Sequence, residues 1–284
     1  MKLSLNAHKV NIDIVAVTGH TRSGKAIMLD TISSFKKFEK FNMDTAIEEA
    51  GSLLFKKKID NLSAMYLVRK FMLMKLYYSC IGREVNFRKN DNTSIYSFRS
   101  PEKYLKRLRL KEGDKTFHNF LNQKPIYPLM IHYGILYSKL LFESFPKLKI
   151  IQMEKNPFEI AYSWINKKYE GGFEKKLRST LLSLNYKKKH IPFYAYKNAK
   201  KYLSLNRFDR VVFVLEILDK IKKKKLNELN SKERKKYLEI NHLDFVTNTN
   251  KVILKLKKFL NSETTQYTKK ILKKNKCPRR IDIT

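Results

Sequence analysis

The sequence predicts an α/β fold in which one central parallel β-sheet is flanked by helices on both faces, giving three layers. Short apolar, β-branched runs alternate with stretches of helical periodicity, which is the pattern of strand–helix–strand units. The first such run leads directly into a glycine-containing loop. No internal repeat and no Gly/Ser/Pro-rich linker divides the 284 residues, so we expect a single domain over residues 10–284.

Five short apolar runs are expected to be strands. The first, residues 11–18, is rich in Val and Ile and ends at Gly19. The others are residues 126–132, 148–154, 210–218 and 237–245, of which 210–218 begins as a strand and passes into a lysine-rich helix. The carboxyl ends of parallel strands meet at one edge of the sheet, and ligands bind there.

Helices are expected between these strands from the spacing of apolar residues. They cover residues 25–37, 101–110, 134–145, 157–164, 192–206 and 250–260, the last capped by Thr247. Residues 41–81 have helical character throughout, whereas 82–101 lack periodicity, as in a long functional loop. We therefore expect residues 41–125 to form a mostly helical and loop insertion that covers the active site. The tail, residues 273–284, is expected to be basic and irregular.

The chain is strongly basic, with 61 Lys and Arg against 26 Asp and Glu and a net charge of +35. This balance favours an anionic partner: nucleic acid, an acidic glycan, an anionic membrane or a phosphate-rich cofactor. Lys far outnumbers Arg, however, and high Lys, Asn and Ile is also the composition that an AT-rich genome produces. Zinc-finger, RNP-like and basic-zipper patterns are absent from the sequence, so specific nucleic-acid recognition is not expected.

The cysteine content and the hydropathy pattern predict a soluble protein. Cys80 and Cys277 are too few for a disulfide framework, and the sequence has no metal-type CxxC pairing. No run approaches the roughly 18 consecutive apolar residues that a membrane span needs. The N-terminal apolar run is short and is interrupted by Asp13, unlike a signal peptide. We therefore expect a cytoplasmic protein that uses no metal.

The loop after the first strand has the composition of a phosphate cradle. Gly19, Gly24 and Lys25 match the Walker A pattern, and the loop lies between an expected strand and helix. Backbone N–H groups in such a loop bind an anion together with the positive end of the helix. We therefore expect a P-loop NTPase-like architecture. Ala26 stands where a hydroxyl would hold Mg²⁺, so a P-loop kinase or nucleotide hydrolase is an alternative that lacks its metal ligand.

The same loop resembles that of another family. Arg22-Ser23-Gly24, followed by Lys25 and Ala26, is similar to the 5′-phosphosulfate loop of sulfotransferases that use 3′-phosphoadenosine 5′-phosphosulfate (PAPS). The resemblance extends over about residues 12–280 and is closest to the bacterial and carbohydrate-type members.

Residues 149–164 resemble the second signature of that family. Lys155 ends an expected strand, Asn-Pro follows it, and Ser163 lies eight positions after the lysine, as in the family pattern. A cation at the strand end and a hydroxyl two helical turns later can converge on one phosphate. His132 ends another expected strand, 23 positions before Lys155, and resembles the family's catalytic histidine.

The resemblance implies in-line transfer of a sulfuryl group from PAPS to a hydroxyl or amine acceptor without a metal. The implied acceptor is a carbohydrate-containing molecule, and the basic charge of the chain suits an acidic glycan. Arg22 would stabilise charge on the leaving phosphate, and His132 would take the proton of the acceptor. The implied nucleotide-binding residues are Arg22, Ser23, Gly24, Lys25 and the backbone of Ala26 at the 5′-phosphate, and Lys155, Ser163, Arg279 and Arg280 at the 3′-phosphate.

The sequence also departs from the family pattern. Lys25 and Ala26 replace two threonines, Lys155 replaces an arginine and loses its bidentate geometry, and Leu243 replaces an acidic residue. These departures leave a third interpretation open, a catalytically inactive anion- or glycan-binding protein on the same fold. The reserve candidates for the base are Glu84, Asp91 and His118, which lie in or near the long loop stretches.

Overall fold

The computed structural model describes residues 5, 9–43, 45–167, 169 and 182–280. Its centre is a five-stranded sheet in the order β2-β3-β1-β4-β7, in which every neighbouring pair of strands is parallel. The strands are β1 (Asp13–Gly19), β2 (Asn42–Met43), β3 (Ile126–His132), β4 (Lys149–Glu154) and β7 (Tyr237–Asn241). A separate antiparallel pair is formed by β5 (Ser183–Tyr186) and β6 (Lys189–Pro192). The predicted α/β fold with a central parallel sheet is confirmed.

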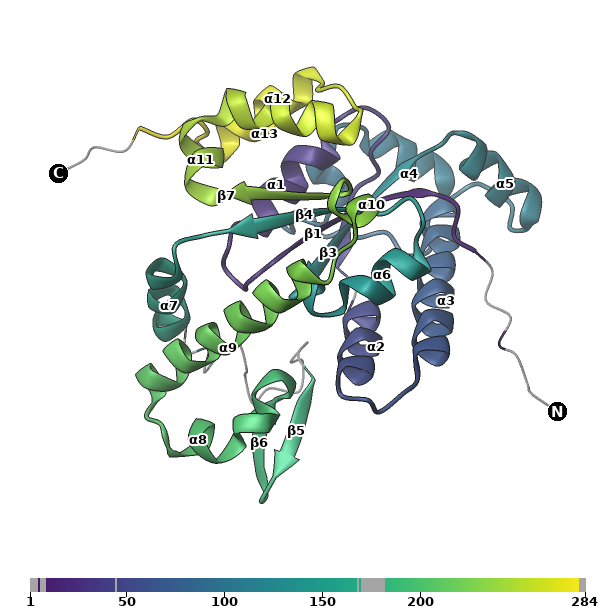
Figure 1. Cartoon of the computed structure of the whole chain (residues 1–284). Coiled ribbons are helices and arrows are strands. Elements are labelled where there is room, and N and C mark those ends of the chain that lie inside the picture. Colours follow the sequence, from purple (N-terminus) through teal and green to yellow (C-terminus); the bar gives the residue numbers. More distant parts are fainter. Residues whose placement is uncertain (1–4, 6–8, 44, 168, 170–181, 281–284) are drawn as a thin grey trace.

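Helices cover both faces of the sheet (Figure 1). One face carries α1 (Lys25–Ser33), α12 (Thr249–Leu260) and α13 (Gln266–Lys274), and the other carries α2 (Ala46–Phe55), α3 (Asn61–Cys80), α6 (Ser138–Ser144) and α9 (Arg207–Asn227). The remaining helices are α4 (Pro101–Arg107), α5 (Asp114–Asn122), α7 (Pro157–Asn166), α8 (Ala199–Ser204), α10 (Ser231–Arg234) and α11 (His242–Thr247), with short 3₁₀ turns η1 (Ile95–Ser97), η2 (Gly134–Tyr137) and η3 (Phe193–Asn198). Among the described helices, none is both long and apolar enough to cross a bilayer.

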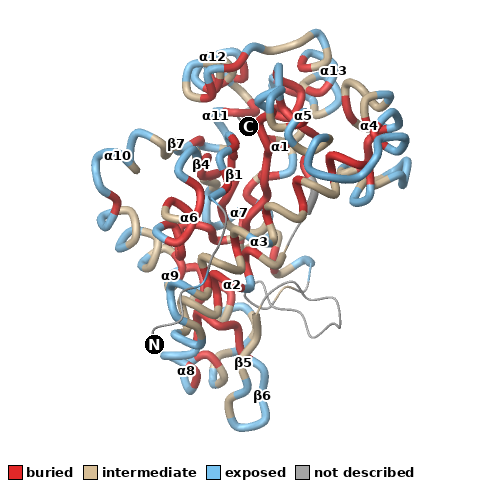
Figure 2. The backbone as a smooth tube through the Cα atoms, turned by 90° about the vertical axis from the view of Figure 1, so that its right-hand side faces the viewer, coloured by how far each residue is buried: buried red, intermediate tan, exposed pale blue. Residues whose placement is uncertain are grey.

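The strands are apolar on both faces because each face packs against a helical layer. Along β1, Ile14 and Ala16 join the core under α2, α3 and α9, whereas Val15 and Val17 join the core under α1 and α12. This division follows from the alternation of side chains along a strand. Figure 2 accordingly shows β1 and β4 as mostly buried, whereas the edge strand β7 is largely half-buried or exposed.

The predicted strand over 210–218 is wrong, because these residues lie within α9. Asn206 caps this helix by accepting hydrogen bonds from the N–H groups of Phe208 and Asp209. Buried residues recur with helical spacing, while Val212 is half exposed at 50%. The buried positions are Val211, Val214, Leu215 and Leu218. The dense β-branched residues suggested a strand, but the buried positions follow the 3.6-residue period of a helix. The Asn206 cap upstream is the sequence signal for that helix.

Smaller corrections concern the ends of elements. The expected strand over 237–245 ends at Asn241, whose side chain accepts from Leu243 N and so begins α11. The predicted cap Thr247 lies inside α11, and α12 follows Asn248 instead. The helical segment 41–81 begins with the short edge strand β2 and then forms two separate helices. Helices α5 and α13 were not predicted; the latter covers the start of the supposedly irregular tail.

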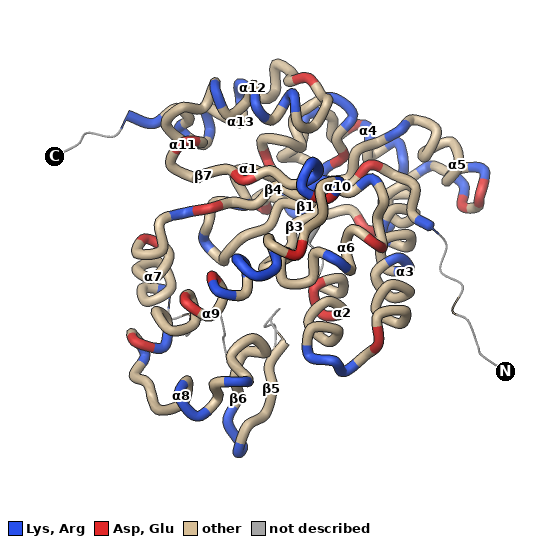
Figure 3. Tube along the Cα trace, viewed as in Figure 1, with Lys and Arg blue, Asp and Glu red and all other residues tan. Residues whose placement is uncertain are grey.

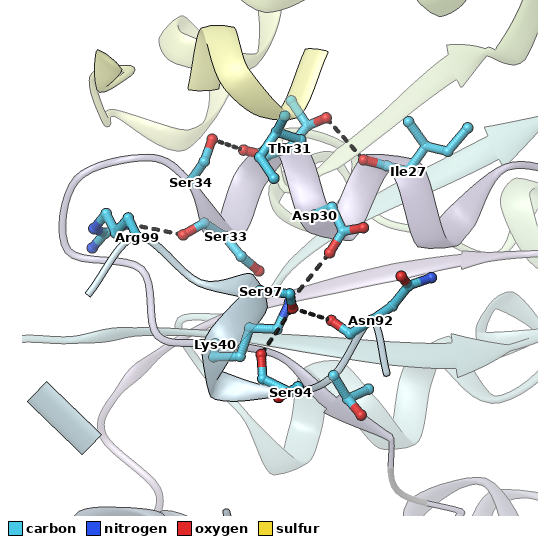
Figure 4. A network of polar contacts seen from close by, with 12 residues as sticks. Ile27, Asp30, Thr31, Ser33, Ser34, Lys40, Asn92, Ser94, Ser97 and Arg99 are labelled. Atoms are coloured by element: carbon cyan, nitrogen blue, oxygen red, sulfur yellow. Dashed lines mark hydrogen bonds and ion pairs between the residues drawn. The ribbon is translucent and has the colours of Figure 1, made fainter. Parts of the chain in front are cut away.

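The segment 82–125 lies at the amino-terminal edge of the sheet. Arg99 donates to the carbonyl oxygen of Ser33, the last residue of α1, at 2.8 Å (Figure 4), and to that of Phe38 at 2.9 Å. Figure 1 shows α4 and α5 on this side, opposite α7 and α11, which follow the carboxyl ends of β4 and β7. The loop 82–101, predicted to be functional and to belong to an insertion that covers the active site, thus lies at the amino edge of the sheet. From the same insertion, α2 reaches the carboxyl edge, where Glu48 contacts His132.

Candidate active site

The loop of residues 19–24 lies at the carboxyl edge between β1 and α1 and has an unusual backbone. Three of its residues have left-handed φ values: Gly19 at +140°, Arg22 at +71° and Gly24 at +93°. Ser23 N donates to His20 O at 3.1 Å, which closes the turn. The indole N–H of Trp164, from α7, donates to Thr21 O at 2.9 Å and ties the loop to the neighbouring element.

The loop fits an anion. Helix α1 begins at Lys25 without a side-chain cap, so the N–H groups of its first turn have no intrahelical partner and carry the positive end of the helix dipole. Ser23 is fully buried, and its hydroxyl has no hydrogen-bond partner among the described residues. An unpaired buried hydroxyl beside unpaired helix N–H groups is the donor set that phosphate or sulfate oxygens require.

Gly24 is needed for a close approach of His242. A Cβ atom at this position would lie 2.4 Å from Cδ2 of His242, the first residue of α11. His242 therefore joins the loop after β1 to the end of β7. Burial lowers the pKa of His242, and the charges of Lys155 and Arg279 lower it further. The imidazole is thus neutral at pH 7 and stands among cationic groups of the site.

We expect Gly24→Ala to destabilise the loop, because both the contact with His242 and the positive φ oppose a side chain. The expected loss is about 1–3 kcal/mol in the free energy of unfolding, measured by urea denaturation. The single tryptophan, Trp164, contacts the loop, so its fluorescence should also change. Gly113→Ala is the matched control, since its φ is +117° but nothing lies within 4 Å. Equal losses of stability in both variants would show that the positive φ alone causes the loss and that the contact with His242 does not contribute.

The two segments that resemble nucleotide-binding signatures are joined by a side-chain hydrogen bond in addition to that from Trp164 to Thr21 O. Nε of Arg22 donates to Oγ of Ser163 at 3.1 Å, which joins residues 141 positions apart. Ser163 lies on α7, two turns after Lys155 at the end of β4. The side chain of Asn156 caps α7 by accepting from Phe158 N, and Pro157 starts the helix. The Asn-Pro pair thus fixes where Ser163 lies relative to the loop after β1.

The cationic residues of the site differ in their contacts and exposure. Nζ of Lys155 lies 2.8 Å from Glu159, whose side chain is half exposed. The backbone N–H of Arg279 donates to Val246 O at 2.6 Å, which fixes the segment after α13 against α11. Arg279 and Arg280 are both exposed. Lys155 and Arg279 both lie near enough to His242 for their charges to lower its pKa.

Lys25 does not extend toward the solvent. Its ammonium group donates to the carbonyl oxygens of Gly19 at 2.9 Å and His20 at 2.6 Å. The side chain is buried, with 4% of the residue exposed. The expectation that Lys25 contacts a phosphate directly is therefore not what its contacts indicate. Ala26, by contrast, is exposed and offers its backbone N–H in the first turn of α1.

His132 forms a hydrogen-bonded pair with Glu48 of α2. Nδ1 of His132 lies 3.0 Å from Oε1 of Glu48, and the same oxygen accepts from the backbone N–H of His132 at 2.9 Å. The carbonyl of His132 accepts from the hydroxyl of Tyr137 at 2.9 Å. These contacts fix the ring, and 19% of the His132 side chain remains exposed. With Nδ1 held by the carboxylate, Nε2 is the nitrogen that can accept a proton.

Comparison with known proteins shows the fold. A sulfotransferase domain from the curacin biosynthetic pathway aligns over 97% of this chain and 80% of its own, at 10% identity and a TM-score of 0.50. The chain has a sulfotransferase-domain fold. A sulfotransferase domain from the Synechococcus PCC 7002 olefin synthase aligns over 94% of this chain and 80% of its own, at 11% identity and a TM-score of 0.48. A sulfotransferase from Mycobacterium tuberculosis H37Rv aligns over 94% and 72%, at 8% identity and a TM-score of 0.46. No family model and no curated protein sequence matches the chain.

On this sulfotransferase fold, the reserve candidates for the base lie away from the carboxyl edge. Glu84 pairs with Lys75 at 3.6 Å, after the end of α3. Asp91 accepts a hydrogen bond from Asn86 within the loop that follows. His118 is exposed on α5, at the amino edge. Among the described residues, no group of three or more His, Cys, Asp or Glu side chains could hold a metal ion.

Sequence reasoning missed two residues of the sulfotransferase fold's carboxyl edge, Glu48 and His242. Glu48 is one of two adjacent glutamates on an amphipathic helix, and nothing in the sequence distinguishes it from its neighbour. His242 could have been found from its position directly after a strand, had the end of β7 been placed at Asn241. Both act through contacts with residues more than eighty positions away, which a local pattern does not encode.

Proposed function

We propose that this protein transfers a sulfuryl group from PAPS to a hydroxyl-bearing acceptor. The observation that carries the proposal is the hydrogen bond of 3.1 Å between Arg22 and Ser163. It brings together the two segments that resemble the 5′-phosphosulfate loop and the 3′-phosphate signature. One ligand with phosphate groups at both ends would bridge them.

The chain would bind such a nucleotide with two groups of donors. The first-turn N–H groups of α1 and the unpaired hydroxyl of Ser23 would hold the 5′-phosphate. Lys155, Ser163 and the basic segment Arg279–Arg280 would hold the 3′-phosphate. The guanidinium of Arg22, positioned by Ser163, would neutralise charge on the leaving phosphate.

The proton of the acceptor would pass to Nε2 of His132. Glu48 accepts from Nδ1 and so holds the ring in the tautomer whose Nε2 is unprotonated. The positive imidazole that forms on proton transfer would then be stabilised by the carboxylate beside it. The reaction needs positioning and charge neutralisation more than covalent chemistry.

We extend the proposal to the acceptor and the compartment. A glycan, in particular an acidic one, suits a protein of net charge +35, and Figure 3 shows Lys and Arg along α9, α12 and the turn between α2 and α3. Both cysteines, Cys80 and Cys277, are free thiols, as is usual in the reducing cytoplasm.

Calorimetric titration with adenosine 3′,5′-bisphosphate, the desulfated product, tests the proposal. We expect metal-independent binding with a Kd of about 1–100 μM. Lys155→Gln should weaken it about tenfold or more, because a charge-assisted hydrogen bond is lost. Lys257→Gln is the matched control: its Nζ also pairs with a glutamate, Glu263 at 2.6 Å, but at the far end of α12.

Other outcomes would contradict the proposal in different ways. Tighter, Mg²⁺-dependent binding of ATP would favour the kinase or nucleotide hydrolase, although Ala26 supplies no hydroxyl for the metal. Binding of the bisphosphate without sulfuryl transfer to any of a panel of sugars, glycans and phenols would favour the inactive binding protein. If the protein binds neither nucleotide, the proposed nucleotide site is wrong.

A further inference from the structure

Lys25 is held inside the nucleotide loop by the loop's own backbone. Its ammonium group donates to two consecutive carbonyl oxygens, those of Gly19 and His20, at 2.9 and 2.6 Å. The carbonyl of His20 also accepts from Ser23 N at 3.1 Å. One carbonyl thus receives both the lysine and the hydrogen bond that closes the turn. Removing the ammonium group would leave that turn with a single, neutral hydrogen bond.

These contacts fix the direction of the loop's donors. In a trans peptide the C=O and the N–H of one unit point in opposite directions. Since Lys25 draws the oxygens of Gly19 and His20 toward itself, the N–H groups of His20 and Thr21 in the same two peptides point away from it. A cation that binds the carbonyl oxygens on one side of a loop orients the N–H groups toward the opposite side, where they can bind an anion.

We propose that Lys25 is a positioning residue, which holds residues 19–24 in the anion-binding conformation from inside the loop and does not itself bind the phosphate. The inference rests on the proposed function only for the identity of the anion. It explains how a chain with Lys25 and Ala26 at these positions, in place of two hydroxyl side chains, can keep an ordered loop.

The charge of this group changes near neutral pH. Burial lowers the pKa of Lys25 to about 7, opposed by the carboxylate of Glu48 on α2. Glu48 itself pairs with His132 of β3, and His20 of the loop is influenced by Lys25 and by Lys222 and Asp219 of α9. Burial, followed by the charges of Lys222 and Lys25, lowers the pKa of His20 to about 3, so that this ring stays neutral at physiological pH. Lys25 therefore donates charge-assisted hydrogen bonds below neutral pH and weaker, neutral ones above it.

Hydrogen exchange of the free protein tests the inference without any nucleotide. The amide of Ser23 is the reporter, because it shares the His20 carbonyl with Lys25. In Lys25→Met, which keeps the apolar stem, we expect this amide to exchange about tenfold faster than in the parent at about pH 6. Lys40→Met is the matched control, since Lys40 is also buried and pairs with Asp30 at 3.2 Å, at the amino edge. It should leave the Ser23 amide unchanged.

The parent protein alone supplies a second readout if Lys25→Met does not fold. The fluorescence of Trp164, whose indole donates to Thr21 O, should change with a midpoint near pH 7. Burial holds the pKa of Tyr133 at about 12 and that of His20 at about 3, so neither ring contributes to this signal. Burial also lowers the pKa of His242, which contacts Gly24, below its usual value, so its titration should lie at lower pH than that of Lys25. Unchanged Ser23 exchange in Lys25→Met, or a parent protein without the fluorescence transition, would overturn the inference.

The outcomes separate this inference from the proposed function. If Lys25→Met weakens binding of adenosine 3′,5′-bisphosphate but leaves the exchange of the free loop unchanged, Lys25 is a direct ligand and the positioning role is wrong. If the loop responds to Lys25 but the bisphosphate does not bind, the positioning role holds and the proposed function fails.

Discussion

His132→Asn is expected to lower sulfuryl transfer by about 10²–10⁴-fold, the usual contribution of a general base. Asparagine keeps a donor that can reach Glu48, and the backbone N–H bond of 2.9 Å to the same carboxylate remains, so the fold should be retained. The affinity for adenosine 3′,5′-bisphosphate should change by less than about twofold, because His132 is assigned to the acceptor and not to the nucleotide. The measurement pairs initial rates of transfer from PAPS with calorimetry on the same preparation.

Two further variants test the assignment of His132 as the base. Glu48→Gln should cause a smaller loss than His132→Asn, of about tenfold or more, because it removes the charge that stabilises the imidazolium but keeps a hydrogen-bond acceptor. His118→Asn changes an exposed histidine on α5, at the opposite edge of the sheet, and should leave the rate unchanged. A loss in His118→Asn, or full activity in His132→Asn, would show that the base is assigned wrongly.

The parts of the site that could be predicted from the sequence are those encoded within one loop. Gly19, Gly24 and the strand before them predict the anion loop, because a turn with left-handed residues requires glycine at two of its positions. The eight-residue interval predicts that Ser163 lies on the helix about two turns after Lys155, and the structure has Lys155 directly after β4 and Ser163 on α7. The strands β1, β3 and β4 could likewise be placed, since each is a short apolar run flanked by turn formers.

The parts that could not be predicted depend on contacts between distant elements. The pairing of His132 with Glu48 spans 84 positions, and the contact of Gly24 with His242 joins the first loop to α11. The long loop 82–101 had the composition of a functional loop, but Arg99 attaches it to the C-terminal end of α1, at the wrong edge for an acceptor. The composition of a segment can show that it is a loop, but it does not show at which edge of the sheet the loop lies.

Glu39→Gln is expected to have the largest effect on stability, about 3–5 kcal/mol in the free energy of unfolding. Glu39 has no exposed side-chain surface, and its carboxylate accepts from Arg107 at 2.9 and 3.1 Å and from Tyr104 at 2.7 Å. Lys103 adds a bond of 2.6 Å from the rim of this cluster. Removing the negative charge leaves the buried guanidinium of Arg107 without its counter-charge. Urea denaturation near pH 7 measures the loss.

Glu112→Gln is the control, because Glu112 also pairs with an arginine, Arg83, but with 59% of its side chain exposed. Exposed pairs contribute at most about 1 kcal/mol, so this variant should unfold near the parent's midpoint. Equal losses in Glu39→Gln and Glu112→Gln would show that burial of the first pair does not matter.

The same cluster should make the protein sensitive to acid. Burial opposes ionisation of Glu39, but Arg107 and Lys103 outweigh it and lower its pKa from 4.5 to about 2. Because the folded pKa lies below the unfolded one, this group stabilises the fold fully above about pH 4.5, and its contribution of about 3 kcal/mol disappears as the pH falls toward 2. Glu39→Gln should therefore lose less stability than the parent between these two pH values. A parent and a variant with parallel acid-denaturation curves would exclude Glu39 as the source of acid sensitivity.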